Sequence, residues 1–176
     1  MSSELEERLK ARFHTFDRND NGYLEGADFD SEVDQILAAT GVAAESPIAR
    51  LLRAAYQAYW WAMLVHLDLN RDSQISFEEY AQIVHRIGEF KSYAKARADA
   101  VDRFTDLNGD GWIERDDYMA VMLAARFAEA AAAAAYDLLG PDQNGRIRAG
   151  RFAGMIMDFY DQIGDAGAAQ KLVPAR

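Results

Sequence analysis

The sequence has no cysteine, and it is poor in histidine and in basic side chains. Without cysteine there is no disulfide, no cysteine nucleophile and no zinc–thiolate site. The 19 Lys and Arg residues are outnumbered by 29 Asp and Glu, which gives a formal net charge of −10. This balance argues against a nucleic-acid partner, because phosphate binding needs clustered Lys and Arg. We find no Ser-His-Asp arrangement, and we expect a protein that is not an enzyme.

Long apolar runs are absent too. No stretch reaches the roughly 20 apolar residues that a membrane helix needs. Residues 1–8 show no apolar segment after a basic start, which a secretory signal would have. We therefore expect a cytoplasmic protein that makes no membrane contact and is a monomer. A chain of 176 residues is long enough to bury a core without disulfides.

The chain does contain a pattern of oxygen-bearing side chains that occurs three times, at residues 17–28 (loop one), 68–79 (loop two) and 106–117 (loop three). In each copy such side chains stand at positions 1, 3, 5 and 12. A tight loop can turn them inward onto one cation, while position 7 contributes its backbone carbonyl. The pattern resembles the calcium loop of an EF-hand and predicts three Ca²⁺ sites. The candidate ligands are Asp17, Asn19, Asn21, Tyr23 and Asp28; Asp68, Asn70, Asp72, Gln74 and Glu79; and Asp106, Asn108, Asp110, Trp112 and Asp117.

A fourth copy at residues 140–151 (loop four) is broken. It has Gly140 at position 1 and Arg151 at position 12, and a guanidinium is always charged and accepts no contact from a cation. We expect a metal-free hand that pairs with loop three. Since EF-hands pair through position 8, the expected contacts are Leu24 with Ile75 and Ile113 with Ile147.

The three intact loops differ in charge and in length of the last ligand. Loop three has the most carboxylates, if Glu114 at position 9 is counted, and should bind most tightly. Asp28 and Asp117 are shorter than the usual Glu at position 12, which makes Mg²⁺ a competitor in loops one and three. Loop two keeps Glu79 at that position. Its weakness is Ser73 at position 6, where a left-handed backbone costs about 1 kcal/mol.

The segments between the loops have helical periodicity throughout. We expect an all-α fold of four EF-hands in two packed pairs that form one compact globule. Residues 1–90 should hold the first pair, residues 91–163 the second, and residues 164–176 a tail. The expected helices are 3–16, 27–40, 47–67, 77–89, 92–105, 115–139 with a break near Phe127, and 149–163.

A stretched interval between loops one and two, one inactive loop and Asp at position 12 together resemble the sarcoplasmic calcium-binding proteins and their bacterial relatives, the calerythrins. The Ala- and Arg-rich composition suggests an actinobacterial member. The resemblance implies two halves that face each other around a shared core, and a Ca²⁺ or Ca²⁺/Mg²⁺ buffer. In calerythrin the inactive hand is the second, whereas here it is the fourth. The aromatic residues that the resemblance places in the core are Trp60, Trp61, Phe90, Tyr93, Phe104, Phe127, Phe152, Phe159 and Tyr160.

Two other functions stay open at this point. A calcium sensor would open a Met-lined groove to an unknown protein target, and Met119, Met122, Met155 and Met157 could line one. A binder of an apolar small ligand would resemble the luciferin-binding proteins. The related photoproteins need several histidines around their ligand, and this chain has only His14, His66 and His85.

Overall fold

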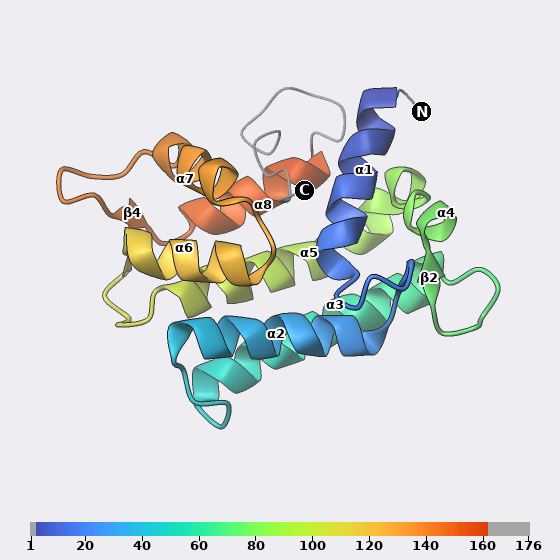
Figure 1. The fold of residues 1–176 in the computed structure, drawn as a ribbon, viewed down its shortest axis with the longest axis horizontal. Helices are drawn as coiled ribbons and strands as arrows, with labels where there is room; N and C mark the ends of the chain where they lie inside the picture. The colour runs from blue at the N-terminus through green and yellow to red at the C-terminus, as the bar shows by residue number, and fades with distance from the viewer. Residues whose placement is uncertain (1–2, 162–176) are drawn as a thin grey trace.

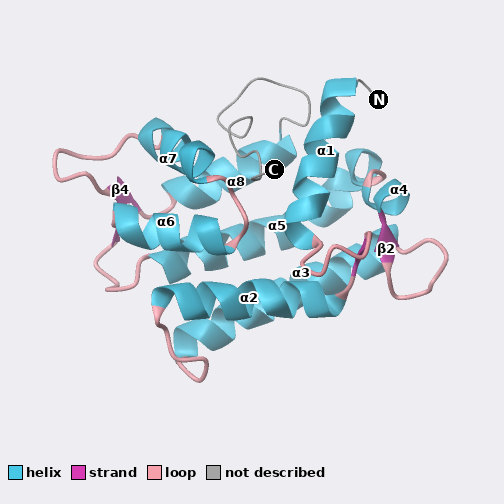
Figure 2. Ribbon diagram, in the orientation of Figure 1, coloured by secondary structure: helices cyan, strands magenta, loops and turns pink. Residues whose placement is uncertain are grey.

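The computed structural model describes residues 3–161, and helices make up most of it (Figures 1 and 2), as the all-α prediction requires. None of the helices in this range is both long and apolar enough to cross a membrane. The helices are α1 (Ser3–Phe16), α2 (Gly26–Thr40), α3 (Pro47–Leu67), α4 (Phe77–Tyr80), α5 (Ile83–Thr105), α6 (Arg115–Ala124), α7 (Glu129–Leu138) and α8 (Arg151–Asp161). The strands are β1 (Tyr23–Leu24), β2 (Ile75–Ser76), β3 (Trp112–Ile113) and β4 (Ile147–Arg148).

Helices α2 and α3 are separated by residues suited to ending and restarting a helix. Gly41 closes α2 in the left-handed region, with φ 68°. The side chain of Ser46 then accepts a hydrogen bond from the N–H of Ala49, at 3.2 Å, and Pro47 occupies the first turn of α3. The missing N–H of proline is no loss there, because the first N–H groups of a helix have no partner within it.

The two short antiparallel strand pairs join the loops back to back. In the first pair Leu24 stands opposite Ile75, and in the second Ile113 stands opposite Ile147. All four side chains are fully buried. The predicted pairing at position 8 is therefore confirmed, and it holds loop one in fixed register with loop two and loop three in fixed register with loop four.

A single hydrophobic core runs through both halves of the described chain. Helix α5 lies at its centre, packed against α3 on one side and α8 on the other, while α2 packs against α6 (Figure 1). The N-terminal and C-terminal loop pairs thus share one core, and α5 runs from one pair to the other.

The helix boundary after loop two differs from the sequence prediction. The expected gap between residues 89 and 92 is wrong, since α5 runs unbroken from Ile83 to Thr105 and the interruption lies at residues 81–82. Phe90, Ala94 and Ala98 explain the continuity, because they form one fully buried stripe at helical spacing. The break near Phe127 is confirmed between α6 and α7. The expected end of the last helix at residue 163 and the tail at 164–176 lie outside the described residues.

Two of the aromatic residues expected in the core lie at the surface. Trp61 is 65% exposed and Tyr93 is 43% exposed. Adjacent residues of a helix point about 100° apart, so only one of two neighbouring tryptophans can face the core. Trp60 takes that place, half-buried with its ring 5.2 Å from that of Phe29. Phe90, Phe104, Phe127, Phe152 and Tyr160 are buried as expected, and Phe159 is partly buried.

Candidate metal centres

Loop one is folded around the oxygens of its own side chains. Asp17, buried at the end of α1, accepts hydrogen bonds from the N–H groups of Asn21 (3.1 Å) and Gly22 (2.9 Å). Asn19 accepts from the N–H of Asn21 at 3.0 Å, and Asn21 accepts from the N–H of Tyr23 at 2.9 Å. Gly22 makes the sharp turn with φ 87°. The side chains at positions 1, 3 and 5 are therefore turned toward the inside of the loop.

Asp28 closes loop one from the first turn of α2. Its two carboxylate oxygens accept hydrogen bonds from the N–H groups of Arg18 (3.0 Å) and Glu25 (2.8 Å). Burial raises the pKa of Asp28 although both N–H groups act to lower it. The short Asp thus reaches both ends of its loop.

Loop two has the same construction with the longer side chain at position 12. Glu79 accepts hydrogen bonds from the N–H groups of Leu69 and Ser76, both at 3.0 Å, which are the positions that Asp28 contacts in loop one. Asp68 accepts from the N–H of Ser73 at 3.0 Å. Ser73 has φ 66°, so the left-handed strain predicted at position 6 is present. Asn70 accepts from the N–H of Asp72, and Asp72 accepts from the N–H of Gln74.

Loop three has the same turn, but among the residues described the carboxylates at its end lack the hydrogen bonds that hold Asp28 and Glu79. As at positions 1, 3 and 5 of the other two loops, the side chains accept hydrogen bonds from backbone N–H groups. Asp106 and Asn108 accept from the N–H of Asp110, and Asp110 accepts from the N–H of Trp112 at 2.9 Å. The side chain of Asp117, in contrast, makes no hydrogen bond within the described part of the chain. Within that part of the chain, the Oε2 atom of Glu114 is buried and has no hydrogen-bond partner. Burial raises the pKa of Asp117, and the neighbouring carboxylates of Glu114, Asp116 and Asp106 raise it further. This concentration of negative charge fits a divalent cation.

The donor sets of the three loops suit a hard cation such as Ca²⁺, since all the candidate atoms are oxygens of carboxylates, amides and one backbone carbonyl. Within residues 3–161, no three Asp, Glu or His side chains converge as they do around a metal bound by such groups alone. In loops one and two the carboxylates are held by backbone N–H groups instead. In each of the three loops the side chains at positions 1, 3 and 5 therefore accept backbone N–H groups of the same turn, without drawing the carboxylates together.

In loop four a positively charged side chain lies at the start of the loop. The guanidinium of Arg151 donates to the backbone carbonyls of Leu139 (2.6 Å) and Gly140 (3.1 Å), at the start of the loop. A Cβ atom on Gly140 would lie 2.8 Å from that guanidinium, so the missing side chain at position 1 makes room for it. This arrangement supports the prediction that loop four holds no metal.

Side chains at position 7 connect the loops within each pair, which the sequence reading missed. Gln74 of loop two donates to Glu25 of loop one at 2.8 Å. Arg146 of loop four lies 3.7 Å from the Asp110 carboxylate and 4.9 Å from the centre of the Trp112 ring, both in loop three. The strand register would have given the signal, because position 7 of one loop lies beside the strand of the other.

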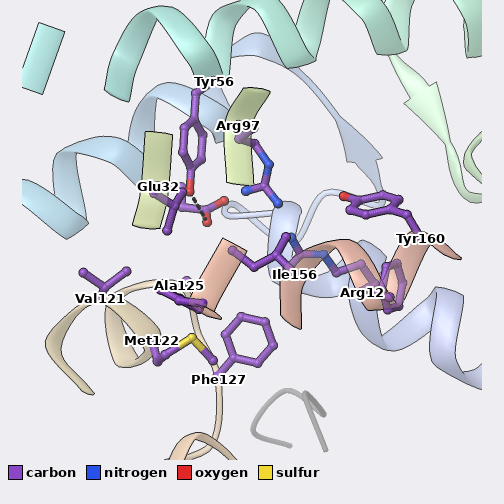
Figure 3. A pocket seen from close by; sticks show the side chains of 13 residues that line it. Arg12, Glu32, Tyr56, Arg97, Val121, Met122, Ala125, Phe127, Ile156 and Tyr160 are labelled. Atoms are coloured by element: carbon purple, nitrogen blue, oxygen red, sulfur yellow. Dashed lines mark hydrogen bonds between the residues drawn. The ribbon is translucent and has the colours of Figure 1, made fainter. Parts of the chain in front are cut away.

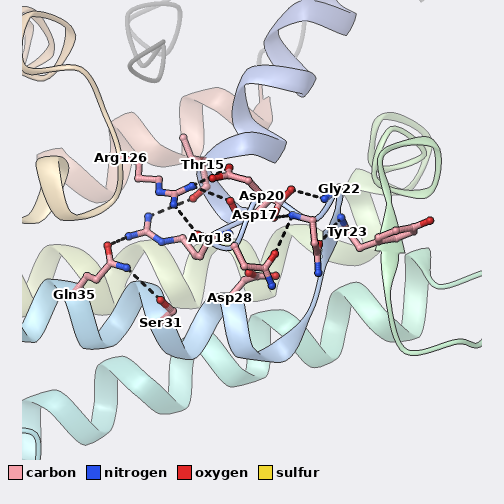
Figure 4. Close-up of polar contacts among 12 residues, drawn as sticks. Thr15, Asp17, Arg18, Asp20, Gly22, Tyr23, Asp28, Ser31, Gln35 and Arg126 are labelled. Carbon is pink, nitrogen blue, oxygen red and sulfur yellow. Dashed lines mark hydrogen bonds and ion pairs between the residues drawn. The ribbon is translucent and has the colours of Figure 1, made fainter.

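A second unforeseen contact joins loop one to the connection between α6 and α7 (Figure 4). Arg126 donates to the backbone carbonyls of Asp17 (2.9 Å) and Arg18 (2.6 Å). Arg18 in turn donates to the carbonyl of Ala124 at 2.7 Å and to the side chain of Gln35. Arg126 holds its own backbone in the left-handed region, with φ 63°. No local sequence pattern indicates this contact, since its partners lie more than 100 residues apart in the chain.

Comparison with known proteins agrees with this geometry. Residues 6–85 match the EF-hand domain pair model. The chain is 26% identical to calerythrin of Saccharopolyspora erythraea over 161 residues, which cover 88% of this chain and 90% of calerythrin. A Streptomyces coelicolor calcium-binding protein, which is described in connection with prokaryotic calcium-mediated regulation, matches with a TM-score of 0.79 and 25% identity over 92% of this chain and 99% of its own. A sarcoplasmic calcium-binding protein from amphioxus has a TM-score of 0.69 at 17% identity, covering 100% of this chain and 99% of its own, and shows the shared fold.

Proposed function

Because this chain is an EF-hand calcium-binding protein and a homologue of calerythrin, we propose that it binds three Ca²⁺ ions and serves as a calcium buffer. Loops one, two and three supply the sites, and loop four supports loop three without a metal. The division into pairs at 1–90 and 91–163 with a tail at 164–176 belongs to this proposal. The cytoplasmic location and the monomeric state remain predictions from the sequence.

The observation that carries the proposal is the unbalanced charge of loop three. Glu114 has a buried carboxylate oxygen without a partner, and the pKa of Asp117 is raised by burial and by like charges. Buried, unpaired carboxylates are costly unless a cation or a hydrogen bond offsets them. A divalent ion would offset both groups at once, which is why we expect loop three to bind most tightly.

In loop three the ion would be held by the side chains of Asp106, Asn108, Asp110 and Asp117 and by the backbone carbonyl of Trp112. The corresponding residues of loop one are Asp17, Asn19, Asn21, Asp28 and Tyr23, and those of loop two are Asp68, Asn70, Asp72, Glu79 and Gln74. The shorter Asp at position 12 of loops one and three suits the six-coordinate geometry of Mg²⁺, which we expect to compete there.

Contacts between the halves support a buffer that stays closed. The shared core joins residues of both loop pairs, and Arg126 ties the α6–α7 connection to the backbone of loop one. A sensor of the opening kind must separate helices to expose an apolar groove, whereas buffer EF-hands barely open. Contacts that cross between the halves oppose such a separation.

A calcium-dependent regulator is the second candidate, and two observations favour it. The similar Streptomyces coelicolor protein is connected with calcium-mediated regulation. The surface of α3 also exposes Trp61 and Val65, which lie one turn apart, and Leu51 nearer the start of the helix. Exposed aromatic and aliphatic side chains on one helix face are suited to a protein partner.

The described residues give less support to a luciferin-type ligand. The cavity found between the halves has a volume of about 40 Å³. Sites for drug-sized molecules have volumes of roughly 300–1,000 Å³. A luciferin-sized molecule would need the helices around the cavity to move apart.

The test is a Ca²⁺ titration of the metal-free protein in the presence of a dye that fluoresces on apolar surfaces, repeated with millimolar Mg²⁺. A constant or falling signal at saturation is expected for the buffer. A rise that Ca²⁺ causes and Mg²⁺ does not would overturn the buffer proposal in favour of the regulator.

Calorimetric titration of two variants tests the ranking of the sites. D106A should lose more affinity than D17A, because loop three has the unbalanced carboxylates. Equal losses would contradict the ranking, and three binding events in the wild type are required by the proposal as a whole.

A further inference from the structure

A cavity of about 40 Å³ lies between the two halves, and its lining is divided into a polar and an apolar side (Figure 3). Arg12, Glu32, Tyr56, Arg97 and Tyr160 supply the polar side. Val121, Met122 and Phe127 lie on the opposite side, with Ile156 between. This division is the pattern of a small-ligand site in which a few polar groups fix the orientation of an apolar body.

The central polar group is Arg97 of α5, which is only 2% exposed. Among the side chains that the structure describes, none of the ion pairs within 4.0 Å involves Arg97. Its guanidinium lies 4.8 Å from the ring centre of Tyr59 and 5.1 Å from that of Tyr56. Aromatic faces stabilise a cation, but they do not accept a hydrogen bond as an anion does. The Nε atom of Arg97 is buried without any such acceptor.

The other charged groups of the lining do not balance Arg97. The carboxylate of Glu32 accepts a hydrogen bond from the hydroxyl of Tyr56 at 3.0 Å. Arg12 is a second cation, and it donates to the hydroxyl of Thr15 at 3.2 Å. With Arg12 and Arg97 positive and Glu32 negative, the lining retains one positive charge. A buried charge of this kind is normally paired.

The excess of positive charge affects the pKa of Tyr160 in α8. Its hydroxyl lies 2.7 Å from that of Tyr59, deep in the core. Burial acts to raise the pKa of Tyr160, but the positive charges of Arg97 and Arg12, together with hydrogen bonding of its hydroxyl to Tyr59 and Arg97, outweigh burial and bring the pKa below its usual value. The two guanidinium groups therefore favour a negative charge at this side of the cavity.

We propose that the cavity binds a short-chain carboxylate, with its carboxylate group at Arg97 and its chain against Val121, Met122 and Ile156. A guanidinium is suited to a carboxylate because its planar donors match the two oxygens. One water molecule needs roughly 10–15 Å³ of such space, so the cavity has room for about three. This size limits the ligand to about the dimensions of acetate to butyrate. The ligand is distinct from the Ca²⁺ ions, and its binding does not depend on the proposed buffer role.

The experiment measures binding of butyrate to the full chain by calorimetry and by ligand-observed NMR, with Ca²⁺ present throughout. Butyramide, which has the same shape without the charge, and chloride, which has the charge without the chain, are the comparison ligands. R97Q removes the guanidinium, and V121F fills the cavity while keeping Arg97. R103Q makes the same charge change at an exposed position of α5 and is the matched control.

The wild type and R103Q should bind one butyrate. R97Q should weaken binding about tenfold or more, as loss of a charged hydrogen-bond partner does, and V121F should weaken it to a similar extent because it occupies the space of the ligand. Butyramide and chloride should bind far more weakly. The proposal is overturned if the wild type shows no saturable binding at millimolar butyrate. It is equally overturned if V121F binds normally, or if butyramide or chloride binds as well as butyrate. Because R97Q can also lose binding by misfolding, V121F and a thermal melt of each variant keep the result decisive.

Discussion

Removing the Arg146 side chain should strengthen calcium binding in loop three. Arg146 belongs to loop four, yet its guanidinium lies 3.7 Å from the Asp110 carboxylate, a proposed ligand at position 5 of loop three. It also covers the Trp112 ring at 4.9 Å and lies 3.4 Å from Asp142. An ion entering loop three must therefore compete with a positive charge that is already attached to the protein.

The size of the effect follows from the exposure of the pair. At 3.7 Å two unit charges interact by about 1 kcal/mol in water and by about 4 kcal/mol at an effective dielectric constant of 20. The side chains are 30% and 43% exposed, so solvent screens the attraction. Exposed pairs of this kind contribute about 0.2–1 kcal/mol net. R146Q should therefore raise the affinity of loop three by a factor of about 1.4 to 5 at low salt, and less as salt is added.

Terbium luminescence offers an assay that reads loop three, because Trp112 lies in that loop and can sensitise a bound Tb³⁺ ion. Displacement of Tb³⁺ by Ca²⁺ gives the relative affinity for wild type, R146Q and R148Q. Arg148 is the matched control, since its guanidinium is 5.9 Å from the Trp112 ring centre and none of the ion pairs of the described residues involves it. An unchanged affinity in R146Q, or an equal gain in R148Q, would refute the competition between Arg146 and the ion.

Three further predictions concern stability, each measured by urea unfolding of the metal-free protein. S73G should raise the free energy of unfolding by about 1 kcal/mol because it relieves the left-handed strain at φ 66°, whereas S73A should not. R126Q should lower it by about 1–2 kcal/mol through the loss of two hydrogen bonds to loop one, and R103Q, which changes the same charge at the surface, should leave it unchanged. Burial raises the pKa of Asp102 although the N–H of Gly150 bonds to its carboxylate, so the contribution of Asp102 is fully present below its ordinary pKa and is lost as the pH rises through its raised value. The stability of the wild type relative to D102N should therefore increase as the pH falls through that range, and a difference independent of pH would contradict this.

The sequence predicted the parts of the fold that depend on local chemistry. The spacing of the oxygen-bearing side chains predicted the loops. A turn that closes around oxygens needs those side chains independently of the rest of the fold. The apolar residue at position 8 predicted the strand register, because burying that side chain in both loops of a pair fixes which residues of the two strands stand opposite each other. Helix caps such as Ser46 gave a correct start for α3 in the same way.

Features that depend on distant residues were not predictable in this way. The continuity of α5 follows from packing of Phe90 and Ala94 against the core, which no local break signal reveals. The orientation of Trp60 and Trp61 depends on which side of α3 meets the core. The five candidate ligands of loops two and three are of similar composition, yet Glu79 is tied to backbone N–H groups and Asp117 is not. The spacing of the residues alone does not show which carboxylate at position 12 is hydrogen-bonded to the backbone and which is not.

The contact between loop one and the α6–α7 connection has a consequence for how the hands move. Helix α6 is the exit helix of loop three, and it ends at Ala124, whose carbonyl accepts a hydrogen bond from Arg18 of loop one. Swinging α6 outward would break that bond together with the two that Arg126 makes. Hydrogen bonds from charged donors contribute about 1 kcal/mol or more each, so opening hand three would cost at least about 3 kcal/mol at loop one alone. Calcium bound at loop three would have to exceed this cost through its preference for the open state, since a ligand shifts an equilibrium only by its differential affinity. An ion that binds the closed hand equally well would leave α6 in place, and this is the behaviour that we expect of a buffer.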